Sequence, residues 1–146
     1  MARLPQLDAT LLTPIVRRAL HAPPAIVTDW RAESLGYRLI NGITGGLWRV
    51  RGAALVDGRP VKWSVVLKVL RRVGLGVAAN FAPTEELAHL NYWRREALAF
   101  GSPHLAALAP GLVAPRCYGV VEPEADSIWL WLEDIVGLPA FGWPLA

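Results

Sequence analysis

Cysteine is nearly absent from this 146-residue sequence, which contains only Cys117. A single cysteine excludes an intramolecular disulfide and a cysteine-built metal cluster, and it is typical of a reducing compartment. The N-terminus lacks an apolar run that ends in a small-residue cleavage site, so no secretory signal is predicted. We therefore expect a cytoplasmic protein.

A long uninterrupted apolar run is also missing, although hydrophobic residues make up 53% of the sequence and charged residues only 18%. The longest stretch without Asp, Glu, Lys or Arg covers residues 97–115 and contains Pro103 and Pro110. A membrane-spanning helix needs about 20 predominantly apolar residues and tolerates such breaks poorly. We expect no membrane partner and a globular domain with a substantial core.

Lysine is scarce, with two residues among the 15 that are basic, and the net charge is only +3. The arginines are spread along the chain, partly as the pairs Arg17-Arg18, Arg71-Arg72 and Arg94-Arg95. Nucleic-acid binding usually requires a basic tract with aromatic platforms. We interpret these residues as a solvated surface and expect no nucleic-acid partner.

Glycine and proline, by contrast, are plentiful and divide the chain into elements. Thr13 as N-cap and Pro14 at the first helical position predict a short N-terminal helix. We expect residues 1–30 to form a helical extension and residues 31–146 to form the main lobe.

Three strands are predicted next, from runs rich in β-branched and aromatic residues. The first two, residues 35–40 and 47–51, are joined by a glycine-rich loop over residues 41–46. A tight Asp57-Gly58 turn leads into the third, residues 61–70. These strands are expected to form an antiparallel meander.

One long helix is predicted over residues 83–100, with Thr84 as its N-cap. The helical period places Leu90, Trp93, Ala97 and Phe100 on one apolar face and Glu96 at its edge. Strands at residues 117–121 and 128–132 follow. The order β-β-β-α-β-β predicts an α+β fold with a five-stranded antiparallel sheet.

Lys68 lies within a nearly continuous apolar strand, where an unpaired ammonium is costly to bury. Glu96, which follows 28 residues later on the helix, is its best candidate partner. A glycine-rich hairpin, a strand lysine and a helix glutamate occur in this order in kinases. Alternatively, the Lys68 stem packs on the strand and its amine extends into solvent.

Four sequence blocks, taken in this order, carry a resemblance to a known family: Trp63–Leu70, Asn91–Ala97, Ala114–Gly119 and Trp129–Asp134. The chain resembles the N-terminal, nucleotide-binding lobe of the aminoglycoside phosphotransferase family in the protein kinase-like superfamily. The resemblance covers most of the chain after about residue 28. It implies a kinase-like N-lobe and ATP as the bound nucleotide.

The resemblance also implies roles for particular residues. Lys68 would contact the α- and β-phosphates of ATP, and Glu96 would hold its amine in place. The residues expected to cover the phosphates are Gly42, Thr44, Gly45 and Gly46. The residues expected to read adenine through backbone groups, in a hinge, are Glu133, Asp134 and Ile135, with Val136 at its end.

The sequence departs from the family pattern in two places. The loop at residues 41–47 is not G-x-G-x-x-G, and no Asp lies between residues 135 and 146 to act as a catalytic base or Mg²⁺ ligand. In the family, the catalytic base and the Mg²⁺ ligand belong to a C-terminal lobe. That lobe would also bind the small-molecule acceptor. We therefore expect that this chain alone does not transfer phosphate.

A second hypothesis assigns the chain to another class, a non-catalytic interaction module derived from such a lobe. Its apolar composition is the motivation, since exposed apolar surface favours self-association.

Overall fold

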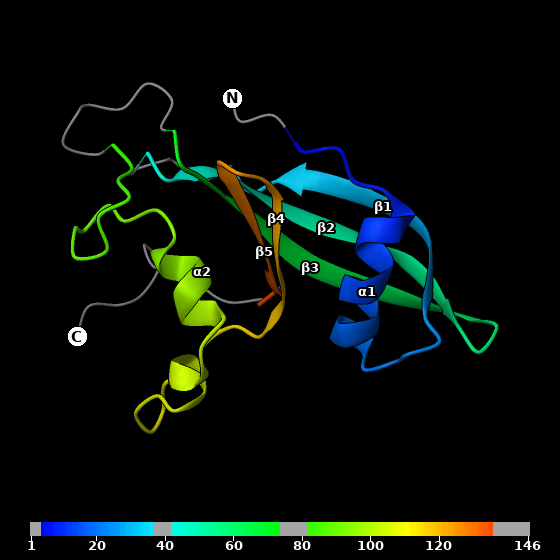
Figure 1. Cartoon of the computed structure of the whole chain (residues 1–146). Helices are drawn as coiled ribbons and strands as arrows, with labels where there is room; N and C mark the ends of the chain where they lie inside the picture. Colours follow the sequence, from blue (N-terminus) through cyan, green and yellow to red (C-terminus); the bar gives the residue numbers. More distant parts are fainter. Residues whose placement is uncertain (1–3, 37–41, 74–81, 136–146) are drawn as a thin grey trace.

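The computed structural model describes residues 4–36, 42–73 and 82–135 and has an α+β fold (Figure 1). Five antiparallel strands form one sheet, as the sequence predicted, and their order in the sheet is β1-β2-β3-β5-β4. The strands are β1 (Ile26–Ser34), β2 (Thr44–Val56), β3 (Arg59–Arg71), β4 (Cys117–Glu124) and β5 (Ser127–Glu133). The helices are α1 (Ala9–Leu20), α2 (Arg95–Phe100) and the 3₁₀ helix η2 (Pro103–Ala106).

The two longest strands, β2 and β3, form the central hairpin of the sheet. They are joined at Asp57 and Gly58, which both have positive φ, 50° and 77°. A two-residue turn with this geometry matches the right-handed twist of the flanking strands. The predicted Asp-Gly hairpin is therefore confirmed, and it fixes the register that places Lys68 opposite Leu47.

The first strand lies earlier in the sequence than predicted. β1 spans Ile26–Ser34, which begins in the range assigned to the N-terminal extension and ends in the main lobe, whereas Leu35 and Gly36 follow it and residues 37–40 lie outside the described ranges. Ile26, Val27 and Thr28 are β-branched, which favours strand structure. β1 pairs with residues 48–55 of β2, so the boundary predicted near residue 30 falls inside the sheet.

Helix α1 begins before the predicted cap. The carboxylate of Asp8 accepts a hydrogen bond from the Leu11 amide at 2.8 Å, whereas Thr13 and Pro14 lie inside the helix. An internal proline costs a backbone hydrogen bond. This helix tolerates it because its apolar face is fully buried against the sheet, at Leu12, Ile15 and Val16.

The predicted long helix is wrong over residues 83–94, because α2 covers only Arg95–Phe100. Thr84 does not cap a helix: it forms a parallel bridge with Tyr92, and its hydroxyl accepts a hydrogen bond from the Glu86 amide. Leu90, expected on the apolar face, is 82% exposed. Of the other residues of the predicted face, Trp93 and Ala97 are buried, and Phe100 is partly buried against the same cluster.

Two apolar clusters lie on opposite faces of the sheet. Leu67 and Trp131, on paired positions of β3 and β5, belong to the cluster beneath α1. Leu130 and Leu70 belong to the cluster that holds Trp93 and α2. Successive side chains of a strand point to opposite faces. Leu67 faces α1, so Lys68, the next residue of β3, faces α2, as Leu70 does.

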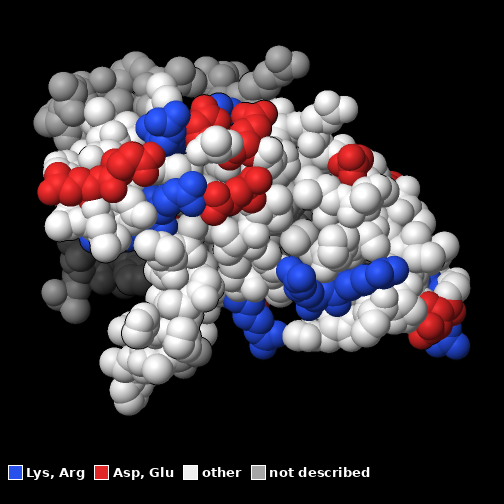
Figure 2. All heavy atoms as spheres, in the orientation of Figure 1, with Lys and Arg blue, Asp and Glu red and all other residues white. Residues whose placement is uncertain are grey.

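Charged side chains of both signs are interspersed near α2 on the face shown in Figure 2. Within the described ranges, no helix has the length and apolar character that crossing a bilayer requires.

Candidate functional site

Lys68 and Glu96 form an ion pair on the α2 face of the sheet. The Lys68 amine lies 2.7 Å from both carboxylate oxygens of Glu96. The two side chains are 22% and 37% exposed, so the pair is partly shielded from water. The predicted contact is therefore confirmed. An ammonium has three N–H donors, so one remains to donate to a ligand oxygen.

Packing around Trp93 determines where Glu96 lies. The Trp93 ring is 1% exposed and sits in the cluster with Ala97, one residue beyond Glu96. On its outer side, the Arg94 guanidinium stacks 4.5 Å from the Trp93 ring centroid and pairs with Glu122 of β4 at 2.9 Å. These contacts attach the start of α2 to the sheet, so a short helix is sufficient to present Glu96 to Lys68.

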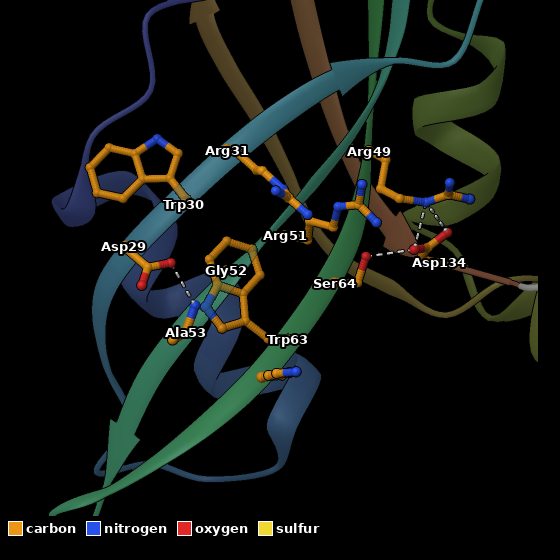
Figure 3. Close-up of a pocket in the computed structure, with 11 residues that line it drawn as sticks. Asp29, Trp30, Arg31, Arg49, Arg51, Gly52, Ala53, Trp63, Ser64 and Asp134 are labelled. Carbon is orange, nitrogen blue, oxygen red and sulfur yellow. Dashed lines mark hydrogen bonds and ion pairs between the residues drawn. The ribbon is translucent and has the colours of Figure 1, made fainter.

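An open groove of about 930 Å³ lies farther along the sheet (Figure 3). Basic and aromatic side chains contribute much of its lining, together with one hydroxyl and two carboxylates. The lining includes Trp30, Arg31, Arg49, Arg51, Lys62, Trp63, Ser64 and Asp134. The Trp63 ring is buried in the cluster beneath α1, so the cations are the groups that a ligand would meet, and the groove is suited to an anion.

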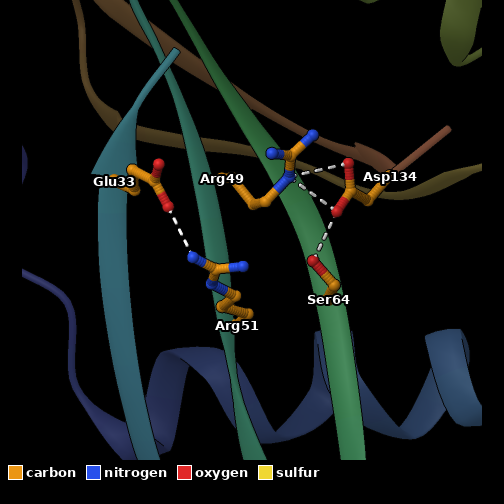
Figure 4. Close-up of polar contacts among 5 residues, drawn as sticks. All are labelled: Glu33, Arg49, Arg51, Ser64 and Asp134. Carbon is orange, nitrogen blue, oxygen red and sulfur yellow. Dashed lines mark hydrogen bonds and ion pairs between the residues drawn. The ribbon is translucent and has the colours of Figure 1, made fainter. Parts of the chain in front are cut away.

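Asp134 connects two strands to the chain that leaves β5 (Figure 4). Its carboxylate accepts hydrogen bonds from Arg49 Nε at 2.8 and 3.1 Å and from the Ser64 hydroxyl at 2.5 Å. Burial raises the pKa of the Asp134 carboxyl, but these hydrogen bonds outweigh burial and hold that pKa below its ordinary value. The same hydrogen bond raises the pKa of Arg49.

The predicted phosphate-covering residues lie at the start of β2 or just before it. Gly42 and Thr44 are buried, and the register pairs Thr44 with Leu70 and Gly46 with Val69, next to Lys68. A Cβ at Gly46 would collide with the indole ring of Trp48. A Cβ at Gly45 would lie 2.9 Å from the Arg71 side chain. Packing therefore requires glycine at position 46, independently of any ligand.

The predicted hinge residues are partly engaged within the chain. The Glu133 amide donates to the Arg116 carbonyl at 2.8 Å, and the Glu133 carboxylate accepts from the Arg116 amide at 3.1 Å. Ile135 is 56% exposed, and Val136 lies outside the described residues. Backbone recognition of a ligand by this segment would therefore fall to Asp134 and Ile135 rather than to the Glu133 amide.

Sequence reasoning missed the arginines of the groove. Arg49 and Arg51 alternate with buried Trp48 and Val50 along β2, a pattern that predicts one apolar and one charged face. Their interpretation as surface residues overlooked that alternation. What the alternation could not show is that Asp134 folds back against Arg49.

Comparison of the chain with protein-family models, curated proteins and solved structures found no match. Among the residues that the structure describes, no group of three or more His, Cys, Asp or Glu side chains is arranged to hold a metal ion.

Proposed function

We propose that this chain binds ATP as the nucleotide-binding lobe of a small-molecule phosphotransferase of the aminoglycoside phosphotransferase type. The ion pair between Lys68 and Glu96 carries the proposal. In kinases a strand lysine, held by a helix glutamate, contacts the nucleotide phosphates and must be in place for transfer. The partly buried amine of Lys68 is held in the corresponding way.

The surroundings of Lys68 support a bound nucleotide. Val66 and Leu132 are cross-strand partners on the same face, two residues along from Lys68 and Leu130. Two residues of a strand cover about 7 Å. An adenine ring lying over Val66 and Leu132 would have its phosphates directed toward Lys68, with the backbone of Asp134 and Ile135 nearby.

Titration calorimetry with ATP tests this proposal, using Lys68→Met and Arg59→Met. Arg59 is the control because it is an exposed cation of the same strand, β3, and does not line the groove. Loss of a charge-assisted hydrogen bond should weaken ATP binding by about 10- to 100-fold in Lys68→Met. Arg59→Met should stay within about twofold of the unmodified protein.

Absence of ATP binding by the unmodified protein, or equal losses in the two variants, would contradict the proposal. Glu96→Gln supplies an intermediate case, because it leaves the Lys68 amine in place but removes the charge that holds it. We expect its ATP affinity to fall between those of the unmodified protein and Lys68→Met.

A second candidate function, a self-associating interaction module, is favoured by exposed apolar side chains over residues 87–113. Leu90 is 82% and Val113 90% exposed, and Leu87 and Leu112 are also exposed. The surface toward the lower left of Figure 2 is largely free of charged side chains. Such surface favours association with another protein surface.

Sedimentation velocity over a range of concentrations tests this second candidate. A self-associating module should show a rising sedimentation coefficient that the double variant Leu90→Glu/Val113→Glu lowers to the monomer value. Ile26→Glu is the control, because Ile26 is 58% exposed on an edge strand away from this segment. Monomeric behaviour of the unmodified protein at all concentrations would exclude the candidate.

A further inference from the structure

Two arginines lie directly opposite each other on neighbouring strands of the groove. The register pairs Arg31 of β1 with Arg51 of β2, and Arg49 lies two residues before Arg51 on the same face of β2. Figure 3 shows the Arg31 side chain extending from β1 toward Arg51. Directly opposed side chains have Cβ atoms about 5 Å apart, and like charges at such positions destabilise a sheet.

Acidic neighbours compensate only part of this charge. Glu33 binds Arg51 Nη2 at 2.7 Å and Asp134 binds Arg49 at 2.8 Å. Arg51 Nε is buried and has no hydrogen-bond partner within the described ranges. No ion pair of Arg31 or Lys62 is found among the described residues.

The other carboxylate of the lining does not neutralise these cations. Asp29 directs one oxygen to the backbone amide of Ala53, at 3.1 Å. That contact holds a bulge of β1 close to β2, where a Cβ at Gly52 would collide with the Asp29 carbonyl.

We propose that this groove is a second ligand site, which binds a small oxyanion carrying at least two negative charges between Arg31, Arg51 and Lys62. Phosphoryl and carboxylate groups both match the planar fork of a guanidinium. The site is separate from Lys68, which lies about 13 Å from Ser64 along β3.

Thermal unfolding with inorganic pyrophosphate tests the proposal, with citrate as a second arm to distinguish phosphoryl from carboxylate ligands. Sodium chloride at equal ionic strength corrects for screening. At ten times its Kd, pyrophosphate should raise the Tm of the unmodified protein by about 4 °C. Citrate should give a similar shift if the site accepts any polyanion, and a smaller one if the site prefers phosphoryl groups.

Arg31→Gln should have two opposite effects. Without ligand it should raise the Tm by about 1–3 °C, because it removes one of two opposed like charges. With pyrophosphate it should lose the ligand-induced shift. Arg59→Gln is the matched control, because Arg59 is an exposed arginine of the same sheet that does not line the groove. It should keep the full shift.

Lys68→Met separates this site from the proposed nucleotide site and should also keep the pyrophosphate shift. Loss of the shift in Lys68→Met would assign the anion to Lys68 and overturn the groove proposal. An unchanged shift in Arg31→Gln would overturn it as well, as would the absence of any shift in the unmodified protein. The groove proposal stands or falls independently of ATP binding.

Discussion

Asp134 joins three parts of the chain through one side chain. Its carboxylate contacts Arg49 on β2 and Ser64 on β3, and its backbone continues the chain beyond β5. The side chain is only 10% exposed, so water competes weakly for these hydrogen bonds. We infer that Asp134 sets the direction in which the chain leaves the sheet.

Replacing Asp134 with Asn should lower the free energy of unfolding by about 1–2 kcal/mol near neutral pH, after allowance for solvent screening. The pKa of Asp134 lies below its ordinary value of 3.8. Its stabilising contribution is therefore present above that value and is lost as the pH falls through the lowered pKa. Urea denaturation from neutral to acidic pH should show the difference between variant and unmodified protein shrinking below about pH 4.

Glu33→Gln is the control for this experiment, because it removes a more exposed carboxylate from a neighbouring ion pair with Arg51. It should cost less than about 0.5 kcal/mol. An Asp134→Asn effect that is equally large at acidic and neutral pH would show that the side chain acts through packing rather than charge.

At the scale of elements, strands were predicted better than helix boundaries. Runs of β-branched and aromatic residues and the Asp57-Gly58 turn identified β2 and β3, because both signals are local. The helix predicted over residues 83–100 failed over residues 83–94, where tertiary packing competes with local preference. Backbone hydrogen bonds between Thr84 and the segment near Tyr92 replace helical ones there.

The predicted ion pair survives this error because it depends on a short stretch of helix. Trp93, just before α2, and Ala97, within α2, are both buried in the same cluster, and their packing is sufficient to position Glu96. The groove could not be predicted in the same way. It requires the β1 register that opposes Arg31 to Arg51, and β1 itself was placed too late in the sequence.

At the scale of the whole molecule, the sheet separates two apolar clusters. Leu12 anchors α1 on one face, whereas Trp93 anchors α2 on the other, and each side chain is at most 1% exposed. The Lys68–Glu96 pair depends directly on the Trp93 side only. Stability and ligand binding should therefore respond differently to damage on the two faces.

Leu12→Ala should cost about 2–5 kcal/mol and Trp93→Ala about 3–5 kcal/mol in the free energy of unfolding, because both leave cavities in a packed core. Under conditions in which both variants remain folded, only Trp93→Ala should weaken ATP binding, since it releases the segment that carries Glu96. Hydrogen exchange gives a second readout that needs no ligand: residues 93–100 should lose protection in Trp93→Ala and keep it in Leu12→Ala. Equal loss of protection in both variants would mean that the faces form one cooperative unit, and that the position of Glu96 depends on the whole fold rather than on the packing of α2.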